Sequence, residues 1–416
     1  MITAQNVASA TVGRSAAEID AQAALAAAAT SERRQMFHQL MEQAVGARYP
    51  ATPVPVAIDR ARFQRMKQTA EAAIRLMASP AYQSEVAGTP WFLPQHPISL
   101  DDCCGSVDFH LGENEEKITE INPMPPGFIG LLELIDTVRR KVFGASYPPV
   151  NDGFEAALAD FMSDRHQHPA LAIAVNHTGA SRKFIPHYRY LARAMCRAGL
   201  DAKLVLAKNF KMNAHGVELK GESVRRIFSI VIFRIMEREP ERFKDFIEIY
   251  RRRPEFIAPN PFVWRLGSKA ILPKLWAIQD RPYGLSESDR QALKRAALPA
   301  AMLSDFQTAS HLADAFGGLD TIVLKPTDDY SSRGVFIKPS REAVERLLTE
   351  RPRPYVVQRF FETSTTPSFD AAGNLLPRKL TVRMGYLRDQ VFGLRAATDP
   401  IASARLSSQI APVVIV

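Results

Sequence analysis

The stretch TIVLKPTDDYSSRGVFI, residues 321–337, decides how the rest of the chain is interpreted. An apolar run, a Lys-Pro pair, a polar loop and a second apolar run predict a strand, a loop and a strand. The loop carries the polar residues Asp328, Asp329, Ser331, Ser332 and Arg333, followed by Gly334. Such a loop offers N–H groups and a guanidinium to an anion, and oxygen ligands to a metal ion. A plain solvated turn explains the same residues, so other segments have to distinguish the two.

Composition narrows the class of protein. The 416 residues are 46% hydrophobic, enough for two or three globular domains. A net charge of +9 comes from 53 basic and 44 acidic residues, without a basic tract or a nucleic-acid-binding motif. This balance favours an enzyme that handles small polyanions over a nucleic-acid-binding protein.

Cysteine usage and hydropathy favour a cytoplasmic protein. Cys103, Cys104 and Cys196 lack the spacing of a disulfide framework or a zinc site. No apolar run has the length of a membrane span, which argues against a membrane partner. The Ala-rich run 24–30 follows acidic residues, unlike a signal peptide, and we expect residues 1–30 to form a flexible N-terminal arm, either helical or frayed, outside any core.

Periodicity along the chain predicts a mixed α/β fold. Apolar residues three and four apart predict helices within 31–86 and a helix that ends at Gly144. Further along, strands at 170–175 and 203–207 flank a helix at 184–198, which is one unit of an open α/β sheet.

Polar residues follow the first strand of this α/β unit: Asn176, His177, Thr178 and Ser181. Ligands of open α/β sheets bind at this edge, so His177 is either a substrate contact or an ordinary loop residue. The apolar run 228–235 is predicted to extend the sheet. A later helix is predicted to begin with Ser286 as its N-cap.

A hairpin-like strand pair, SVDFHL at 106–111 and KITEINP at 117–123, carries a second candidate site. Strand alternation places Asp108 opposite the apolar face of the first strand, and it places Glu120, Asn122 and Ile118 on one face of the second. Three oxygen-bearing side chains can then converge as Mg²⁺ requires. A solvent-exposed hairpin face is the alternative and needs no metal.

Three further segments carry residues that can complete this site. Gly267 and Ser268 precede Lys269 at the start of a predicted helix. The run YVVQRFF at 355–361 is predicted to be a buried strand. Two strands within 378–399 carry Arg383 and Arg395, which we expect to face one cleft.

Taken in this order, these segments resemble the ATP-grasp ligases, and in particular the circularly permuted branch that includes eukaryotic-type glutathione synthetase and glutathionylspermidine synthase. The resemblance covers residues 90–416. The segments that carry the resemblance are, in chain order, the Asp…Glu-x-Asn strand pair, the α/β unit, RLGSKAILPKL, VLKPTDDYSSRGVFI, YVVQRFFE with STTP after it, and GLRAATD. The ordered set is more specific than any single motif.

The resemblance implies an α/β (α+β) fold: a circularly permuted ATP-grasp core with an inserted open α/β substrate domain. Residues 31–150 would then contribute helices and the metal-binding strand pair. Residues 151–240 would form the substrate-binding domain, and residues 241–416 the nucleotide-binding region.

The resemblance also implies roles for single residues, with ATP and Mg²⁺ as cofactors. Lys269, Lys325 and the loop residues Ser331, Ser332 and Gly334 would contact the phosphates. The strand around Gln358, Arg359 and Phe360 would hold the adenine edge. Glu120 and Asn122 resemble the Mg²⁺ ligands, with Asp108 at or just behind the metal and Asp329, in preference to Asp328, completing the site. Arg395 resembles an arginine that binds a substrate carboxylate or the transferred phosphate.

Two departures from the family pattern stand out. The loop has Tyr-Ser-Ser-Arg where relatives usually have glycines, which gives Arg333 part of the phosphate contact. The segment Gln358-Arg359 lacks an acid that relatives carry at the second position, which puts one ribose or adenine contact in doubt.

These residues suit an ATP-dependent carboxylate–amine ligase that forms an acyl phosphate and then an amide or peptide bond, releasing ADP and phosphate. Its substrates would be a small acid or peptide and an amine, such as an amino acid, short peptide or polyamine. A nucleotide- or nucleic-acid-binding protein without ligase activity, and a small-molecule kinase, are the alternatives. The oligomeric state stays open, and a homodimer is compatible with the sequence.

Overall fold

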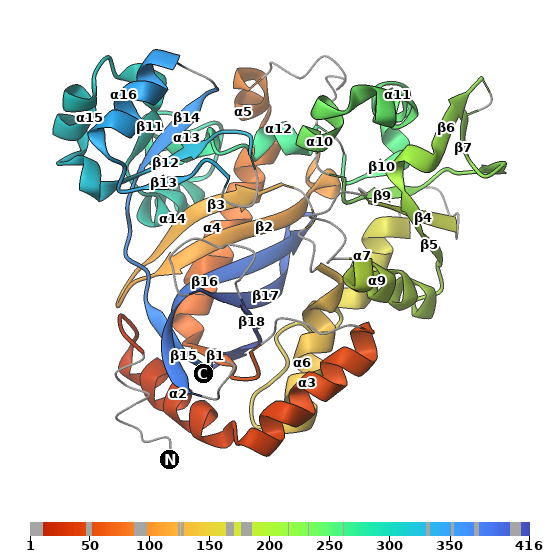
Figure 1. The fold of residues 1–416 in the computed structure, drawn as a ribbon, viewed down its shortest axis with the longest axis horizontal. Coiled ribbons are helices and arrows are strands. Elements are labelled where there is room, and N and C mark those ends of the chain that lie inside the picture. The colour runs from red at the N-terminus through yellow and green to blue at the C-terminus, as the bar shows by residue number, and fades with distance from the viewer. Residues whose placement is uncertain are drawn as a thin grey trace.

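The computed structural model describes residues 11–46, 52–86, 98–123, 125, 129–163, 170–175, 185–214, 216–231, 233–260, 262–329, 333–350, 353–369, 374–399 and 409–416. They form a mixed α/β fold in which several sheets are covered by helices (Figure 1). Within these ranges, no helix combines the length and the apolar character that crossing a membrane requires.

The central sheet joins the two ends of the chain. Its strands run in the order β18-β17-β16-β2-β3, and β15 also pairs with β16. The N-terminal strands β2 and β3 therefore lie beside the C-terminal strands β16 and β17 (Figure 1). The bounds are β2 Cys104–Leu111, β3 Glu116–Asn122, β15 Thr365–Phe369, β16 Leu375–Leu387, β17 Gln390–Asp399 and β18 Gln409–Ala411.

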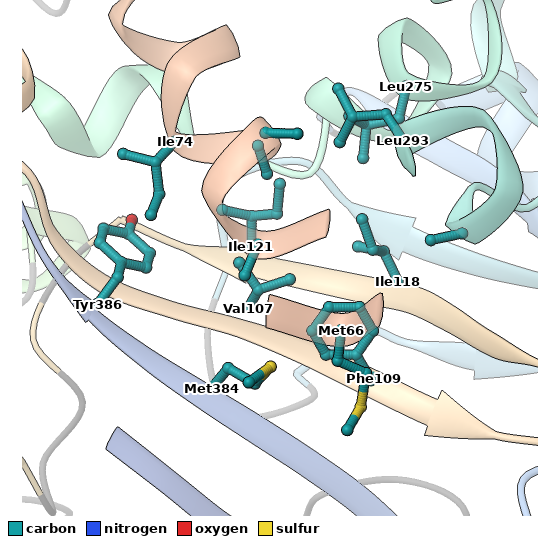
Figure 2. Packing of buried hydrophobic residues seen from close by; sticks show 14 of the residues in the cluster. Met66, Ile74, Val107, Phe109, Ile118, Ile121, Leu275, Leu293, Met384 and Tyr386 are labelled. Carbon is teal, nitrogen blue, oxygen red and sulfur yellow. The ribbon is translucent and has the colours of Figure 1, made fainter. Parts of the chain in front are cut away.

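One face of this sheet is apolar because its inward-pointing positions are hydrophobic. Val107 and Phe109 of β2 lie beside Met384 of β16, and helix α4 (Arg60–Ala78) covers them with Met66 and Ile74 (Figure 2). Helices α13 (Ile271–Trp276) and α14 (Glu287–Ala296) add Leu275 and Leu293 to the same core. Ser286 accepts a hydrogen bond from the Asp289 N–H, which confirms the predicted N-cap.

A β-bulge changes the predicted face of one residue. Asp108 pairs with Glu120, but the next residue, Phe109, pairs with Ile118, so Thr119 has no partner in the register. The prediction that Ile118 shares a face with Glu120 and Asn122 is therefore wrong, because the bulge rotates Ile118 into the core. The bulge thus allows Ile118 to be buried while Glu120 and Asn122 point to the opposite face of the sheet.

A second, smaller antiparallel sheet contains the strand–loop–strand that was predicted for residues 321–337. Its order is β11-β14-β12-β13, and the strand, loop and strand prediction is confirmed by β12 and β13. Helices α15 and α16 cover one face with Leu312, Phe316 and Leu347. The bounds are β11 Ala300–Met302, β12 Ile322–Pro326, β13 Phe336–Ile337, β14 Tyr355–Arg359, α15 Ala309–Phe316 and α16 Arg341–Glu350.

The predicted α/β unit forms a parallel sheet in the order β10-β9-β4-β5, with β4 and β5 joined through helix α9. The predicted strand at 228–235 ends early, and α10 begins at Phe233, because β9 pairs with β4 only as far as Ser229. Strands β6, β7 and β8 form a small antiparallel sheet that follows β5 in the chain, and β6 and β7 project beside β5 (Figure 1). The bounds are β4 Ala170–Val175, β5 Asp201–Leu206, β6 Phe210–Asn213, β7 Gly216–Leu219, β8 Glu222–Ser223, β9 Ile227–Ser229, β10 Ile257–Ala258, α7 Phe154–Ser163, α9 Ile185–Arg197, α10 Phe233–Arg238 and α11 Lys244–Arg252.

Residues 11–30 of the expected flexible arm are packed against the rest of the protein, and residues 1–10 lie outside the described residues. Helix α2 (Ala16–Ala28) begins with a capping box at Ser15 and packs Leu25 against the parallel pair β1–β19. Its Glu18 is buried and receives hydrogen bonds from Arg14 and from the Asp59 N–H, and it lies beside buried Arg62. This polar cluster holds α2 against the rest of the protein. The Ala-rich pattern of the segment does not predict the cluster. The remaining bounds are β1 Val56–Ile58, β19 Val413–Ile415, α3 Ser31–Val45, α5 Pro80–Glu85 and α6 Leu132–Phe143.

Replacement of Glu18 by alanine is expected to lower the free energy of unfolding by roughly 3–5 kcal/mol, because it leaves the buried Arg14 without its carboxylate, while Arg62 keeps Asp59 as a partner at 3.8 Å. Urea denaturation followed by circular dichroism measures the loss. Glu32→Ala, at an exposed position in the first turn of α3, is the control and should change stability by about 0.5 kcal/mol or less. An equal, small effect of both variants would contradict a structural role for the Glu18 cluster.

Candidate functional site

A cleft lies between the polar face of the central sheet and the smaller antiparallel sheet. It encloses about 730 Å³, part of which is open to solvent. The central sheet contributes Asp108, His110, Thr119, Glu120 and Thr381 to the lining of the cleft, and Lys269 reaches it from the segment before α13. The smaller sheet and the residues next to its strands contribute Leu298, Val323, Lys325, Val335, Ile337, Gln358, Arg359, Phe360 and Phe361.

Four charged residues form a row across four neighbouring strands of the central sheet. Glu120 of β3 pairs with Asp108 of β2, Asp108 with Arg383 of β16, and Arg383 with Arg395 of β17. Directly paired residues project to the same face, so the row carries two acids and then two bases. The register places Arg383 and Arg395 on one face, but neither is among the residues that line the cleft, so the expectation that both face one cleft stays a prediction.

Asp108 forms an ion pair with Arg383. Both carboxylate oxygens accept hydrogen bonds from the Arg383 guanidinium, and Asp108 is only 2% exposed. Burial opposes the charged form of Arg383, but Asp108 and Glu120 raise its pKa above the ordinary value. Asp108 thus holds the Arg383 guanidinium in place, and its position at or just behind the metal stays a prediction.

Lys269 reaches the row from another part of the chain. Its Nζ lies 2.8 Å from the Glu120 carboxylate and donates to the Asp329 carbonyl at 2.8 Å. The close approach depends on Gly267, since a Cβ there would come within 2.7 Å of the Pro123 ring at the end of β3. Burial opposes ionisation of Glu120, yet Lys269, Arg383 and Lys325 together lower its pKa.

Lys325 lies opposite, on β12, and is held by neutral groups. Its Nζ donates to the Thr119 carbonyl at 2.8 Å and to the Gln358 side-chain oxygen at 2.7 Å. The acceptor carbonyl belongs to the bulge residue of β3, so the bulge also helps to aim the lysine. Burial lowers the pKa of Lys325 to about 8, partly offset by Glu120. Gln358, which is 2% exposed, also donates to the Ile118 carbonyl and is held in place at both ends.

The polar loop after β12 is anchored by an arginine that sequence reasoning missed. Arg353 pairs with the Asp329 carboxylate, and its guanidinium packs against Gly334, whose φ is +69°. A Cβ at Gly334 would come within 2.3 Å of Arg353 Nη2, so a larger residue would displace the guanidinium, and the positive φ itself favours glycine. Asp328 is half-buried and Arg333 exposed, while Ser331 and Ser332 lie outside the described residues. Arg353 precedes a strand in a charged stretch, and no sequence signal distinguishes it from a solvated residue.

The end of β14 lines the outer part of the cleft. The Arg359 N–H donates to the Pro299 carbonyl and the Phe360 N–H to the Thr321 carbonyl. Both N–H groups already donate to carbonyls of the protein. The predicted contact with the edge of an adenine base would therefore need other main-chain N–H groups or the main-chain carbonyls of this segment. The Lys338 ammonium lies 4.8 Å from the centre of the Phe360 ring.

Arg395 continues the row on the far side, where the α/β unit approaches. It is 5% exposed. Burial first, and then the positive charge of Arg395, lower the pKa of His187 on α9 to about 4. His187 is thus a neutral residue near Arg395 that the sequence did not reveal. The predicted candidates Asn176, His177, Thr178 and Ser181 lie outside the described residues.

One oxygen-bearing side chain of β3, Glu120, lies in the cleft and fits a divalent cation that is also held by phosphate oxygens. Asn122 lies two residues further along β3 on the same face and is not among the residues that line the cleft, and its Nδ2, a donor, is buried without a hydrogen-bond partner among the described residues. Within those residues no group of three His, Cys, Asp or Glu side chains forms a complete metal site. Mg²⁺ commonly uses one or two protein carboxylates together with substrate phosphates, so the donor set suits a cation that enters with a polyphosphate.

Comparison with known proteins supports the fold. The structure resembles a glutathione synthetase-like effector (GSS30) from Globodera pallida, with a TM-score of 0.58 and 12% identity over 92% of this chain and 98% of that one. It also matches a proposed gamma-glutamylcysteine synthetase from Methylobacillus flagellatus KT, with a TM-score of 0.44 and 9% identity over 78% and 81% of the two chains. No family model matches the sequence, and no curated protein shows significant sequence similarity to it. The chain therefore has a glutathione synthetase-like fold, at low sequence identity.

Replacement of Arg383 by methionine is expected to cost roughly 3–5 kcal/mol of unfolding free energy, because Asp108 is then buried without its ion-pair partner. The double variant Arg383→Met with Asp108→Asn should recover most of that loss, since it removes the carboxyl group that was left unpaired. Urea denaturation of the two single variants and the double variant completes the cycle. Strictly additive losses would contradict direct coupling of the two residues.

Proposed function

We propose that the protein is an ATP-dependent carboxylate–amine ligase of the circularly permuted ATP-grasp type, which releases ADP and phosphate. The observation that carries the proposal is the convergence of Lys269 and Lys325, from separate elements, on Glu120 in a cleft between two antiparallel sheets. Two cations beside an acidic oxygen ligand are the arrangement that a metal-bound polyphosphate needs. The glutathione synthetase-like fold supports a ligase over other nucleotide-binding proteins.

ATP would lie between the sheets with its phosphates toward Lys269 and Lys325 and its base toward the aromatic end at Phe360 and Phe361. Glu120 and Asn122 would hold Mg²⁺, together with a carboxylate of the loop. The Asp329–Arg353 pair favours Asp328 for that third contact. Bound Mg²⁺ would offset phosphate charge during phosphoryl transfer.

The chain's own residues would position the reactants and stabilise charge. The two lysines, with Arg333 and the loop around Ser331, Ser332 and Gly334, would neutralise the phosphates as the γ-phosphoryl group moves to a substrate carboxylate. Arg395 would hold that carboxylate or the transferred phosphate in line for attack. An amine bound nearby would then displace phosphate to form the amide. The acid would be a small acid or peptide, and the amine an amino acid, peptide or polyamine.

A nucleotide-binding protein without ligase activity is the second candidate. The observation that favours it is the engagement of Asp108 and Asp329 by arginines, which reduces the acidic oxygens available to a metal. Incubation with a pooled panel of amino acids, peptides and polyamines separates the candidates. Binding of ATP without substrate-dependent turnover would select the second, and turnover without an amine would indicate a kinase.

Replacement of Lys325 by alanine is expected to lower ADP-forming turnover by roughly 10²-fold or more, because a charge that acts on the transferred phosphoryl group is lost. Mass-spectrometric product analysis of ATP with the pooled panel gives the measurement. Lys294→Ala is the matched control, since Lys294 donates to the Trp276 carbonyl outside the cleft. Release of AMP and pyrophosphate by the wild type would rule out the proposed reaction.

Binding of Mg·ATP is expected to weaken as the pH rises above about 8, because Lys325 loses its proton there and the phosphates bind its charged form. Near and above that pH, binding should take up protons, which calorimetry in two buffers of different ionisation enthalpy measures. Lys325→Arg stays charged over this range and should flatten the dependence. Proton uptake that is the same in both proteins would assign the effect to another group.

A further inference from the structure

Glu120 and Lys269 occupy each other in the ligand-free protein. Their charged atoms lie 2.8 Å apart, with side-chain exposures of 29% and 11%, and both residues line the cleft. Lys269 is also held by the Asp329 carbonyl at 2.8 Å, so the ion pair closes the space between β3 and the loop after β12. The pair stands where the phosphates and the cation are proposed to bind.

The proposed function, on which the following inference rests, requires these two residues to separate. Glu120 is needed as an oxygen ligand of a divalent cation, and Lys269 as a partner of phosphate oxygens. A polyphosphate that enters without a cation takes Lys269 away from Glu120 and then faces the bare carboxylate. A cation that enters alone meets a carboxylate that Lys269 already neutralises, with Lys325 and Arg383 close enough to affect its charge.

We infer that the Glu120–Lys269 ion pair is an internal substitute for both ligands, which makes a divalent cation and a nucleotide polyphosphate bind to this protein cooperatively. When both enter together, the cation replaces Lys269 as the partner of Glu120, and the phosphates replace Glu120 as the partner of Lys269. Each ligand removes the repulsion that the other would meet alone. Such coupling is reciprocal, so the same factor links metal affinity to nucleotide affinity.

The same strand supplies a matched control. Glu116 of β3 forms an ion pair of equal length, 2.8 Å, with Arg65, and neither residue lines the cleft. Glu116→Gln therefore removes a carboxylate and an ion pair from β3 without changing the charge that a ligand in the cleft would meet.

The first test measures binding of ATP by calorimetry, with EDTA and with excess Mg²⁺, to the wild type, Glu120→Gln and Glu116→Gln. The wild type should bind metal-free ATP roughly 5- to 150-fold more weakly than Mg·ATP. Glu120→Gln should bind metal-free ATP about 5-fold or more tightly than the wild type does, because Lys269 is released and the repelling carboxylate is gone. Glu116→Gln should match the wild type.

A gain of affinity cannot result from misfolding, so the outcomes are distinct. Unchanged or weaker binding of metal-free ATP by a folded Glu120→Gln variant overturns this inference and leaves the proposed function standing if the wild type binds Mg·ATP. Failure of the wild type to bind ATP under both conditions overturns the proposed function as well.

The complementary test measures Mn²⁺ binding without nucleotide by electron paramagnetic resonance. Lys269→Met removes the internal cation and leaves Glu120 available, so Mn²⁺ should bind about 5-fold or more tightly than to the wild type. The double variant Lys269→Met with Glu120→Gln should lose this gain. Mn²⁺ affinity that does not rise in Lys269→Met would contradict the substitution of one ligand by the other.

Discussion

The antiparallel pairing of β2 with β16 is the contact on which the rest of the site depends. It joins strands that are separated by more than half of the chain, and it sets Asp108 directly opposite Arg383. A shift of one residue would turn Asp108 into the core and expose Val107, so burial of one face fixes the register strongly. The buried ion pair between the two residues adds a penalty for any other alignment, because each charge would lose its partner.

Charge balance in the cleft follows from that register. Glu120, Asp108 and Arg383 lie in one row, while Lys269 and Lys325 approach from the other side, so each of the two acids has a basic partner without a ligand, and Lys325 is a further base that neutral groups hold. The burial that lowers the pKa of Lys325 to about 8 is the same burial that makes its charge effective toward a phosphate. Each carboxylate of the row is thus paired with a base in the protein without a ligand.

Several features of the site were predictable because they depend on local patterns. Alternation in 106–111 identified the polar face of β2, and the apolar runs around Lys325 and Gly334 identified the strands β12 and β13. The bulge at Thr119 was not predictable, since an extra residue in one strand becomes visible only through its pairing with the other. The packed helix α2 was missed for a related reason, because its buried Glu18 is stabilised by Arg62, far away in sequence. Arg353 is another such case, since only the fold brings it to Asp329.

The sequence by itself determined the mixed α/β class, the strand–loop–strand at 321–337, the α/β unit and the residue types that can meet a metal-bound polyphosphate. These follow from periodicity and turn chemistry, which act over a few residues. The tertiary structure alone decided which charges face each other: Asp108 with Arg383, Glu120 with Lys269 and Asp329 with Arg353. Ion pairs depend on distances between segments far apart in the chain, and those distances exist only after the sheets have packed.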